Sequence, residues 1–95
     1  MKCERLIFTG HAIQRMFERG IGKGDVQTVV AVGATIEDYP HDTPLPSRLV
    51  LGFVGGRPIH VVLAIDSAAA VCIVVTVYEP QPDQWETDFR RRRAR

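Results

Sequence analysis

The sequence predicts a single α+β domain in which a helical N-terminal third precedes a meandering antiparallel sheet. Three observations support this prediction. Residues 10–19 carry apolar side chains at helical spacing, residues 48–66 form two apolar runs around a Gly-Gly pair, and residues 71–79 are rich in β-branched residues. A chain of 95 residues has room for one such domain. We expect two N-terminal helices packed on three to four antiparallel strands, with a short C-terminal helix or tail.

The first predicted helix spans residues 10–19. Thr9 is suited to cap its N-terminus, and Gly20 is suited to end it in the left-handed conformation. A turn at residues 22–25 leads into a second helix, which Gly33 ends. The residues expected to face inward are Ala12, Ile13, Met16 and Phe17 in the first helix, and Val26, Val29, Val30 and Val32 in the second.

The rest of the chain predicts strands at residues 34–39, 48–54, 57–66 and 71–79, and residues 6–8 suggest a short edge strand. Gly55-Gly56 is a typical two-residue hairpin turn. Pro80 and Pro82 end the last strand because proline cannot donate a ladder hydrogen bond. Trp85 and Phe89 lie four residues apart, and we expect both to pack back on the body of the domain.

Charge divides the chain into a mildly acidic body and a basic end. Five of the 12 basic residues fall within residues 90–95, so residues 1–89 keep seven against 11 acidic residues, a net charge of −4. We therefore predict one domain over residues 1–89 and an arginine-rich tail over residues 90–95. Such a tail is typically solvated, and it can also contact phosphates without sequence preference.

Composition also predicts the cellular location of the protein and the redox state of its cysteines. The apolar runs are too short to cross a membrane, and residues 1–8 lack the long apolar stretch of a secretory signal. Cys3 and Cys72 are too few for a disulfide framework. We therefore expect no membrane association, a cytoplasmic location and two reduced thiols.

Several short motifs follow one another along the chain. They are His11-Ala12, Arg15-Met16, Arg19-Gly20-Ile21, Tyr39-Pro40, Arg57-Pro58-Ile59-His60-Val61-Val62, Thr76-Val77-Tyr78-Glu79-Pro80 and Trp85. Their order resembles a family of small bacterial proteins classed only as a domain of unknown function. That family resembles the RelE/ParE-like toxin superfamily, and its members are often found beside zinc-finger antitoxins of the MqsA type. The resemblance covers residues 9–93. It implies a RelE/ParE-like fold and a toxin that acts on RNA and pairs with an antitoxin-like protein.

One candidate site lies on the first helix. His11, Arg15 and Arg19 are spaced i, i+4 and i+8, so they line one helix face. Arginine can hold a phosphate with two parallel hydrogen bonds, and histidine can move a proton near neutral pH. These three residues therefore suit phosphate chemistry. The alternative is a solvated polar face in which Glu18 and Asp25 pair with the arginines.

A second candidate lies in the sheet. His60 sits within an apolar strand, where a histidine is either a half-buried structural residue or a proton-transfer group. If the strands around the turn at residues 67–70 pair, His60 lies roughly opposite Thr76 or Tyr78.

The functional hypothesis is a metal-free ribonuclease, in which the ribose 2′-hydroxyl attacks the neighbouring phosphate. His11 or His60 would be the general base or acid, and Tyr78 would orient the substrate or donate a proton. The phosphorane would be stabilised by Arg15, Arg19 or Arg57.

Two alternatives involve no chemistry. One is a binding module that docks a partner protein, with the arginine tail meeting nucleic acid or that partner. The other is a homodimer, which an exposed apolar strand edge such as residues 49–54 would favour. No metal site or cofactor is predicted, because the sequence has no close pair of zinc ligands and no phosphate-binding glycine loop. The sequence leaves open whether the protein is an enzyme.

Overall fold

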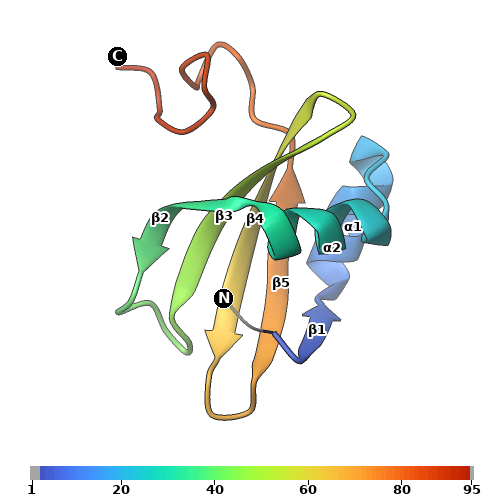
Figure 1. Cartoon of the computed structure of the whole chain (residues 1–95), viewed down its shortest axis with the longest axis vertical. Helices are drawn as coiled ribbons and strands as arrows, with labels where there is room; N and C mark the ends of the chain where they lie inside the picture. The colour runs from blue at the N-terminus through green and yellow to red at the C-terminus, as the bar shows by residue number, and fades with distance from the viewer. Residues whose placement is uncertain (1–2, 95) are drawn as a thin grey trace.

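Two helices lie on one face of a five-stranded mixed sheet (Figure 1). The structure is a computed structural model that describes residues 3–94. Its elements are β1 (Arg5–Phe8), α1 (Gly10–Arg19), α2 (Lys23–Val32), β2 (Ala34–Tyr39), β3 (Ser47–Val54), β4 (Arg57–Asp66) and β5 (Val71–Tyr78). Between the helices and the sheet lies the apolar core, to which β3, β4 and β5 all contribute buried residues.

The sheet has the strand order β1-β5-β4-β3-β2. Strands β2 to β5 form the expected antiparallel meander, and β1 adds a parallel strand beside β5. The expectation of three to four antiparallel strands is therefore wrong in number and in the direction of one strand. The N-terminal run joins the sheet because β5 offers it an open edge, where Thr9 also donates its backbone N–H to the Val74 carbonyl.

Helix α1 begins and ends where the sequence predicts. The Thr9 hydroxyl accepts a hydrogen bond from the backbone N–H of Ala12, and Gly20 closes the helix with a φ of 64°. Its buried residues are Ala12 and Met16 alone. The prediction that Ile13 and Phe17 face inward is wrong, because α1 packs mainly on β5 and buries only a narrow stripe. Their exposed fractions are 45% and 88%.

Helix α2 packs on β3 and β4 through Val26 and Val29, as predicted. Val32 was expected to face inward, but it is 79% exposed because only one stripe of the helix meets the sheet. Gly52 on β3 permits the close contact between the two elements. A Cβ atom at Gly52 would lie 2.8 Å from the Cγ2 atom of Val29.

Residues 80–94, which we call the C-terminal segment, fold back over the end of the sheet (Figure 1). Turns replace the short helix that the sequence allowed. Trp85 is 3% exposed and stacks edge-on against His60, with ring centroids 4.4 Å apart. The guanidinium of Arg92 lies 4.7 Å from the Trp85 ring centroid, and Phe89 packs against Phe53. Both predicted aromatic anchors therefore contact the body of the domain.

Cys3 and Cys72 form a disulfide that ties the segment before β1 to β5. The expectation of two reduced thiols is therefore wrong. The cause is the parallel pairing of β1 with β5, which brings residues 69 positions apart into contact and which the sequence did not predict.

Strand β3 pairs with β4 along its whole length, but β2 pairs only with residues 47–51 of its other edge. The apolar edge at residues 49–54 that would favour a homodimer is therefore covered as far as Leu51, and among the described residues no strand pairs with residues 52–54 on the β2 side. Within residues 3–94, neither helix has the length and apolar character needed to cross a membrane.

Candidate functional site

A cleft of about 280 Å³ opens beside the end of β5. One wall is α1, the floor is β5, and the opposite wall is the first part of the C-terminal segment. The residues that line it are His11, Arg15, Arg19, Thr76, Val77, Tyr78, Glu79, Gln81, Gln84 and Trp85. The cleft exists because β1 covers β5 only as far as Val74, where the chain turns away into α1.

His11, Arg15 and Arg19, which we call the basic row, form the α1 wall. The predicted pairing with acidic residues is realised once, by Arg15 Nη1 and Glu18 Oε1 at 3.5 Å. Asp25 instead accepts the backbone N–H of Gly22 at 2.9 Å and caps α2. Among the described residues, the side chains of His11 and Arg19 have no hydrogen-bond or ion-pair partner. The basic row therefore presents imidazole and guanidinium groups to the cleft.

Tyr78 connects the cleft to His60. The two residues are directly paired across β4 and β5, as the sequence reasoning allowed. The Tyr78 hydroxyl lies 3.2 Å from His60 Nδ1, and His60 Nε2 lies 2.8 Å from the Phe89 carbonyl oxygen. Because a carbonyl can only accept, Nε2 carries the proton. Neutral His60 then accepts at Nδ1, and Tyr78 donates its O–H to it.

Burial keeps both members of this pair neutral. It lowers the pKa of His60, and the nearby positive charge of Arg92 lowers it further, against a raising effect of the Phe89 carbonyl. Burial likewise raises the pKa of Tyr78. His60 is 0% exposed, so it cannot touch a ligand in the cleft. It can act on such a ligand only through Tyr78.

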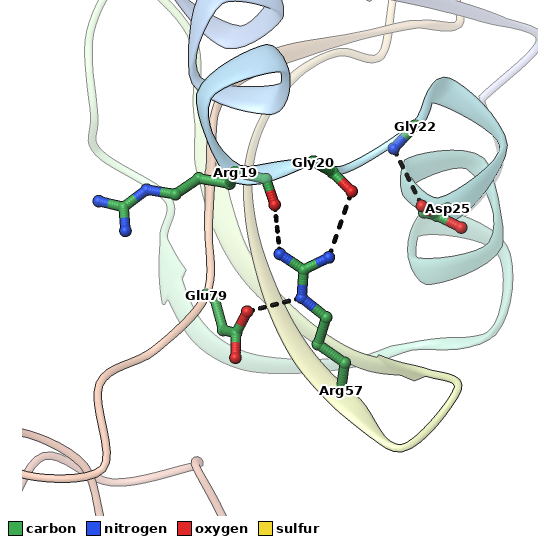
Figure 2. A network of polar contacts seen from close by, with 6 residues as sticks. All are labelled: Arg19, Gly20, Gly22, Asp25, Arg57 and Glu79. Atoms are coloured by element: carbon green, nitrogen blue, oxygen red, sulfur yellow. Dashed lines mark hydrogen bonds and ion pairs between the residues drawn. The ribbon is translucent and has the colours of Figure 1, made fainter.

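Arg57 lies outside the cleft, at the C-terminal end of α1 (Figure 2). Its guanidinium lies at the C-terminus of α1, where Nη1 donates to the Gly20 carbonyl at 3.2 Å and Nη2 donates to the Arg19 carbonyl. Its Nε pairs with Glu79 at 2.6 Å. These contacts join β4, α1 and the end of β5, and Arg57 does not line the cleft. The Arg19 side chain extends away from this network (Figure 2).

The structure thus brings four of the six predicted site residues to one cleft: His11, Arg15, Arg19 and Tyr78. His60 lies behind Tyr78, and Arg57 holds the end of the helix that carries the basic row.

The sequence reasoning missed the two amide side chains in the cleft, Gln81 and Gln84. The only signal for them in the sequence is the Pro-Gln-Pro run at residues 80–82, and that run indicates only the end of a strand.

Residues 3–94 contain no group of three or more His, Cys, Asp or Glu side chains that could hold a metal ion. The side chains that line the cleft supply imidazole, guanidinium, phenol, hydroxyl and amide groups and the carboxylate of Glu79.

The fold and the cleft define a small α+β protein whose polar cleft has one cationic wall, suited to an anionic ligand. The chain belongs to the family described as domain of unknown function DUF4258, whose model matches residues 8–79. No curated protein and no solved structure matches the chain.

Proposed function

We propose that the protein is a toxin-type endoribonuclease that cleaves RNA in the cleft without a metal ion. One observation carries the proposal. The basic row and Tyr78, which come from opposite ends of the chain, line the same open cleft. Two arginines supply charge and bidentate hydrogen bonds for a phosphate, and an imidazole supplies proton transfer. These are the groups that an RNA phosphodiester requires when its own 2′-hydroxyl is the nucleophile.

The roles follow from the positions of the side chains. His11 takes the proton from the 2′-hydroxyl, whose oxygen attacks phosphorus. Arg15 and Arg19 stabilise the negative charge of the phosphorane. The 5′-oxygen leaves and takes a proton from water in the open cleft, which gives a 2′,3′-cyclic phosphate and a 5′-hydroxyl. Tyr78 donates its own proton to His60, so its oxygen is free to accept a hydrogen bond from a different donor of the substrate and orient it, while the single proton of the 2′-hydroxyl goes to His11.

The proposal includes the relationship to RelE/ParE-like toxins, an antitoxin-like partner and a cytoplasmic location. Support comes from the order of the elements, in which two helices precede the antiparallel meander, and from the motifs at residues 11–21, 57–62 and 76–80. A reducing cytoplasm opens disulfides. In that compartment Cys3 and Cys72 would be two adjacent thiols.

Controlled expression in a bacterial host tests the proposal. Wild-type protein should arrest growth, and total RNA should fragment over the same period. Arg15→Ala should remove both effects, because it removes a guanidinium that stabilises the phosphorane. Among residues 3–94 the only hydrogen-bond or ion-pair partner of the Arg15 side chain is Glu18, so the substitution should leave the fold intact. Equal growth and intact RNA with wild type and variant would overturn the proposal.

A second candidate is the non-enzymatic module that docks a partner protein or a second copy. The exposed side chains of Ile13 and Phe17 favour it, because they lie four residues apart and make an uncovered apolar ridge on α1. At 100° per residue this ridge is opposite the basic row, so a docked protein would leave the cleft open. Phe17→Ser should abolish co-purification of such a partner, and an unchanged yield would exclude this surface.

A further inference from the structure

The wall of the cleft opposite the basic row is a tight turn at residues 81–85, which we call the glutamine turn. Its backbone is fixed by its own hydrogen bonds. The Gln81 carbonyl accepts from the backbone N–H groups of Gln84 and Trp85, at 3.0 and 3.1 Å. The Gln84 carbonyl accepts from the N–H of Arg93 at 2.8 Å, and the Pro82 carbonyl accepts from Arg93 Nε at 2.8 Å. These backbone carbonyls therefore accept hydrogen bonds either from the turn itself or from Arg93.

The turn is also anchored by packing. Trp85 is buried against His60 and covered by Arg92, and Pro80 precedes the turn as a buried residue. Pro80 and Pro82 flank Gln81 and restrict its backbone. A side chain on such a fixed backbone loses less conformational entropy when it binds a ligand. The glutamine turn is therefore preorganised.

The two glutamine side chains of the turn, unlike its backbone carbonyls, make no hydrogen bonds to the described residues. Gln81 and Gln84 are both exposed, both line the cleft, and neither side-chain amide has a hydrogen-bond partner among residues 3–94. Each amide offers an acceptor and two donors in one plane. The cleft thus has a cationic wall for a phosphate and, from the chain after β5, two neutral amides beside the Glu79 carboxylate, whose charge is paired with Arg57. A nucleotide has this same division into charged phosphate and neutral base edge.

We propose that the glutamine turn recognises the base of an unpaired RNA nucleotide whose phosphate lies on the basic row. This inference rests on the proposed function and names the feature of RNA that the cleft selects. Amide side chains hydrogen-bond base edges in pairs, and sequence-specific RNA recognition targets single strands whose base edges are accessible. The ligand is therefore single-stranded RNA, and its binding depends on the identity of the base in the cleft.

Binding of fluorescent oligonucleotides to the full chain tests this inference. The probes are four single-stranded homopolymers, one for each base, with 2′-fluoro sugars that lack the nucleophilic hydroxyl and cannot be cleaved. Wild-type protein should prefer one base by about tenfold, the discrimination of one good bidentate pair. The favoured oligonucleotide should bind less tightly once it is hybridised to its complement, because the duplex hides the base edge.

Gln81→Met and Gln84→Met remove the amides while they keep the side-chain length. Each should bring the four affinities closer together and leave the binding of the least favoured base unchanged. Gln27→Met, on the exposed side of α2, is the matched control and should keep the wild-type preference. Fluorescence of Trp85 shows whether the turn is still folded in each variant.

Equal affinity of wild-type protein for all four bases would overturn the inference. An undiminished preference in both glutamine variants would overturn it as well. A preference that depends on the glutamines, in a protein that cleaves no natural RNA, would support base recognition and overturn only the proposed reaction.

Discussion

Arg57 illustrates how one side chain can connect three elements. Its guanidinium caps the C-terminus of α1 through two carbonyls and pairs with Glu79 beyond β5. The carbonyls at a helix end have no partner within the helix, so a cation there is favourable. The basic row depends on this arrangement, because it projects from the helix that Arg57 holds.

We predict that Arg57→Met lowers the free energy of unfolding by about 2 kcal/mol, the cost of losing charge-assisted hydrogen bonds at partly buried groups. Arg15→Met, on the helix whose C-terminus Arg57 caps, is the control. Its single exposed ion pair is worth less than about 1 kcal/mol, so this variant should unfold close to wild type. Urea denaturation of both proteins checks the difference, and equal midpoints would contradict the role given to Arg57.

His60 should make stability depend on pH. Its pKa in the folded protein is lowered from 6.5 by burial, so below pH 6.5 the unfolded chain binds a proton that the native state does not. The free energy of unfolding should therefore fall as the pH drops from about 6.5 toward 5, by at most about 1.4 kcal/mol per pH unit. His60→Gln should flatten this slope, and His41→Gln, in the exposed loop after β2, should keep it. Thermal melts over this pH range would contradict the prediction if both variants retained the wild-type slope.

At the scale of elements, α2 and β3 approach each other closely at Gly52. Gly52 faces Val29 so closely that a methyl group would lie 3.1 Å from the Val29 Cα atom. The helix could move only by disturbing the packing of Val26 and Val29.

Gly52→Ala should therefore destabilise the protein by about 1–3 kcal/mol, the usual cost of overpacking. Gly24→Ala is the matched control. A Cβ atom at Gly24 meets nothing within 4 Å, and alanine is the better helix former. That variant should be as stable as wild type or more stable. The order of the two melting temperatures checks the prediction, and a Gly52→Ala protein as stable as the Gly24→Ala protein would contradict it.

For the whole molecule, the sequence predicted the elements better than their arrangement. Local signals located both helices, the cap at Thr9, the hairpin at Gly55-Gly56 and the antiparallel meander. The parallel contact of β1 with β5 and the Cys3–Cys72 disulfide were missed, since both join distant parts of the chain. Apolar periodicity also overstated burial, because it cannot tell how wide a stripe of a helix the sheet will cover, as Phe17 shows.

For the candidate site, too, the sequence predicted local positions but not contacts between distant parts of the chain. Helical spacing was enough to place His11, Arg15 and Arg19 on one face. Reflection across the turn at residues 67–70 placed His60 roughly opposite Thr76 or Tyr78, and the structure pairs it with Tyr78. Spacing carries no information about what covers a face. It therefore could not show that the C-terminal segment buries His60, or that the same segment brings two glutamines to the cleft.

The central claim is that the cleft between the basic row and the glutamine turn cleaves RNA, and one measurement tests it most directly. Purified full-length protein is incubated with a single-stranded RNA of mixed sequence, and the products are analysed by mass spectrometry. Wild-type protein and His41→Ala, which changes an exposed histidine away from the cleft, should both release fragments ending in 2′,3′-cyclic phosphate. His11→Ala should release them at least about a hundredfold more slowly, the usual contribution of a general base. Intact RNA with wild-type protein, or equal cleavage by His11→Ala, would contradict the account.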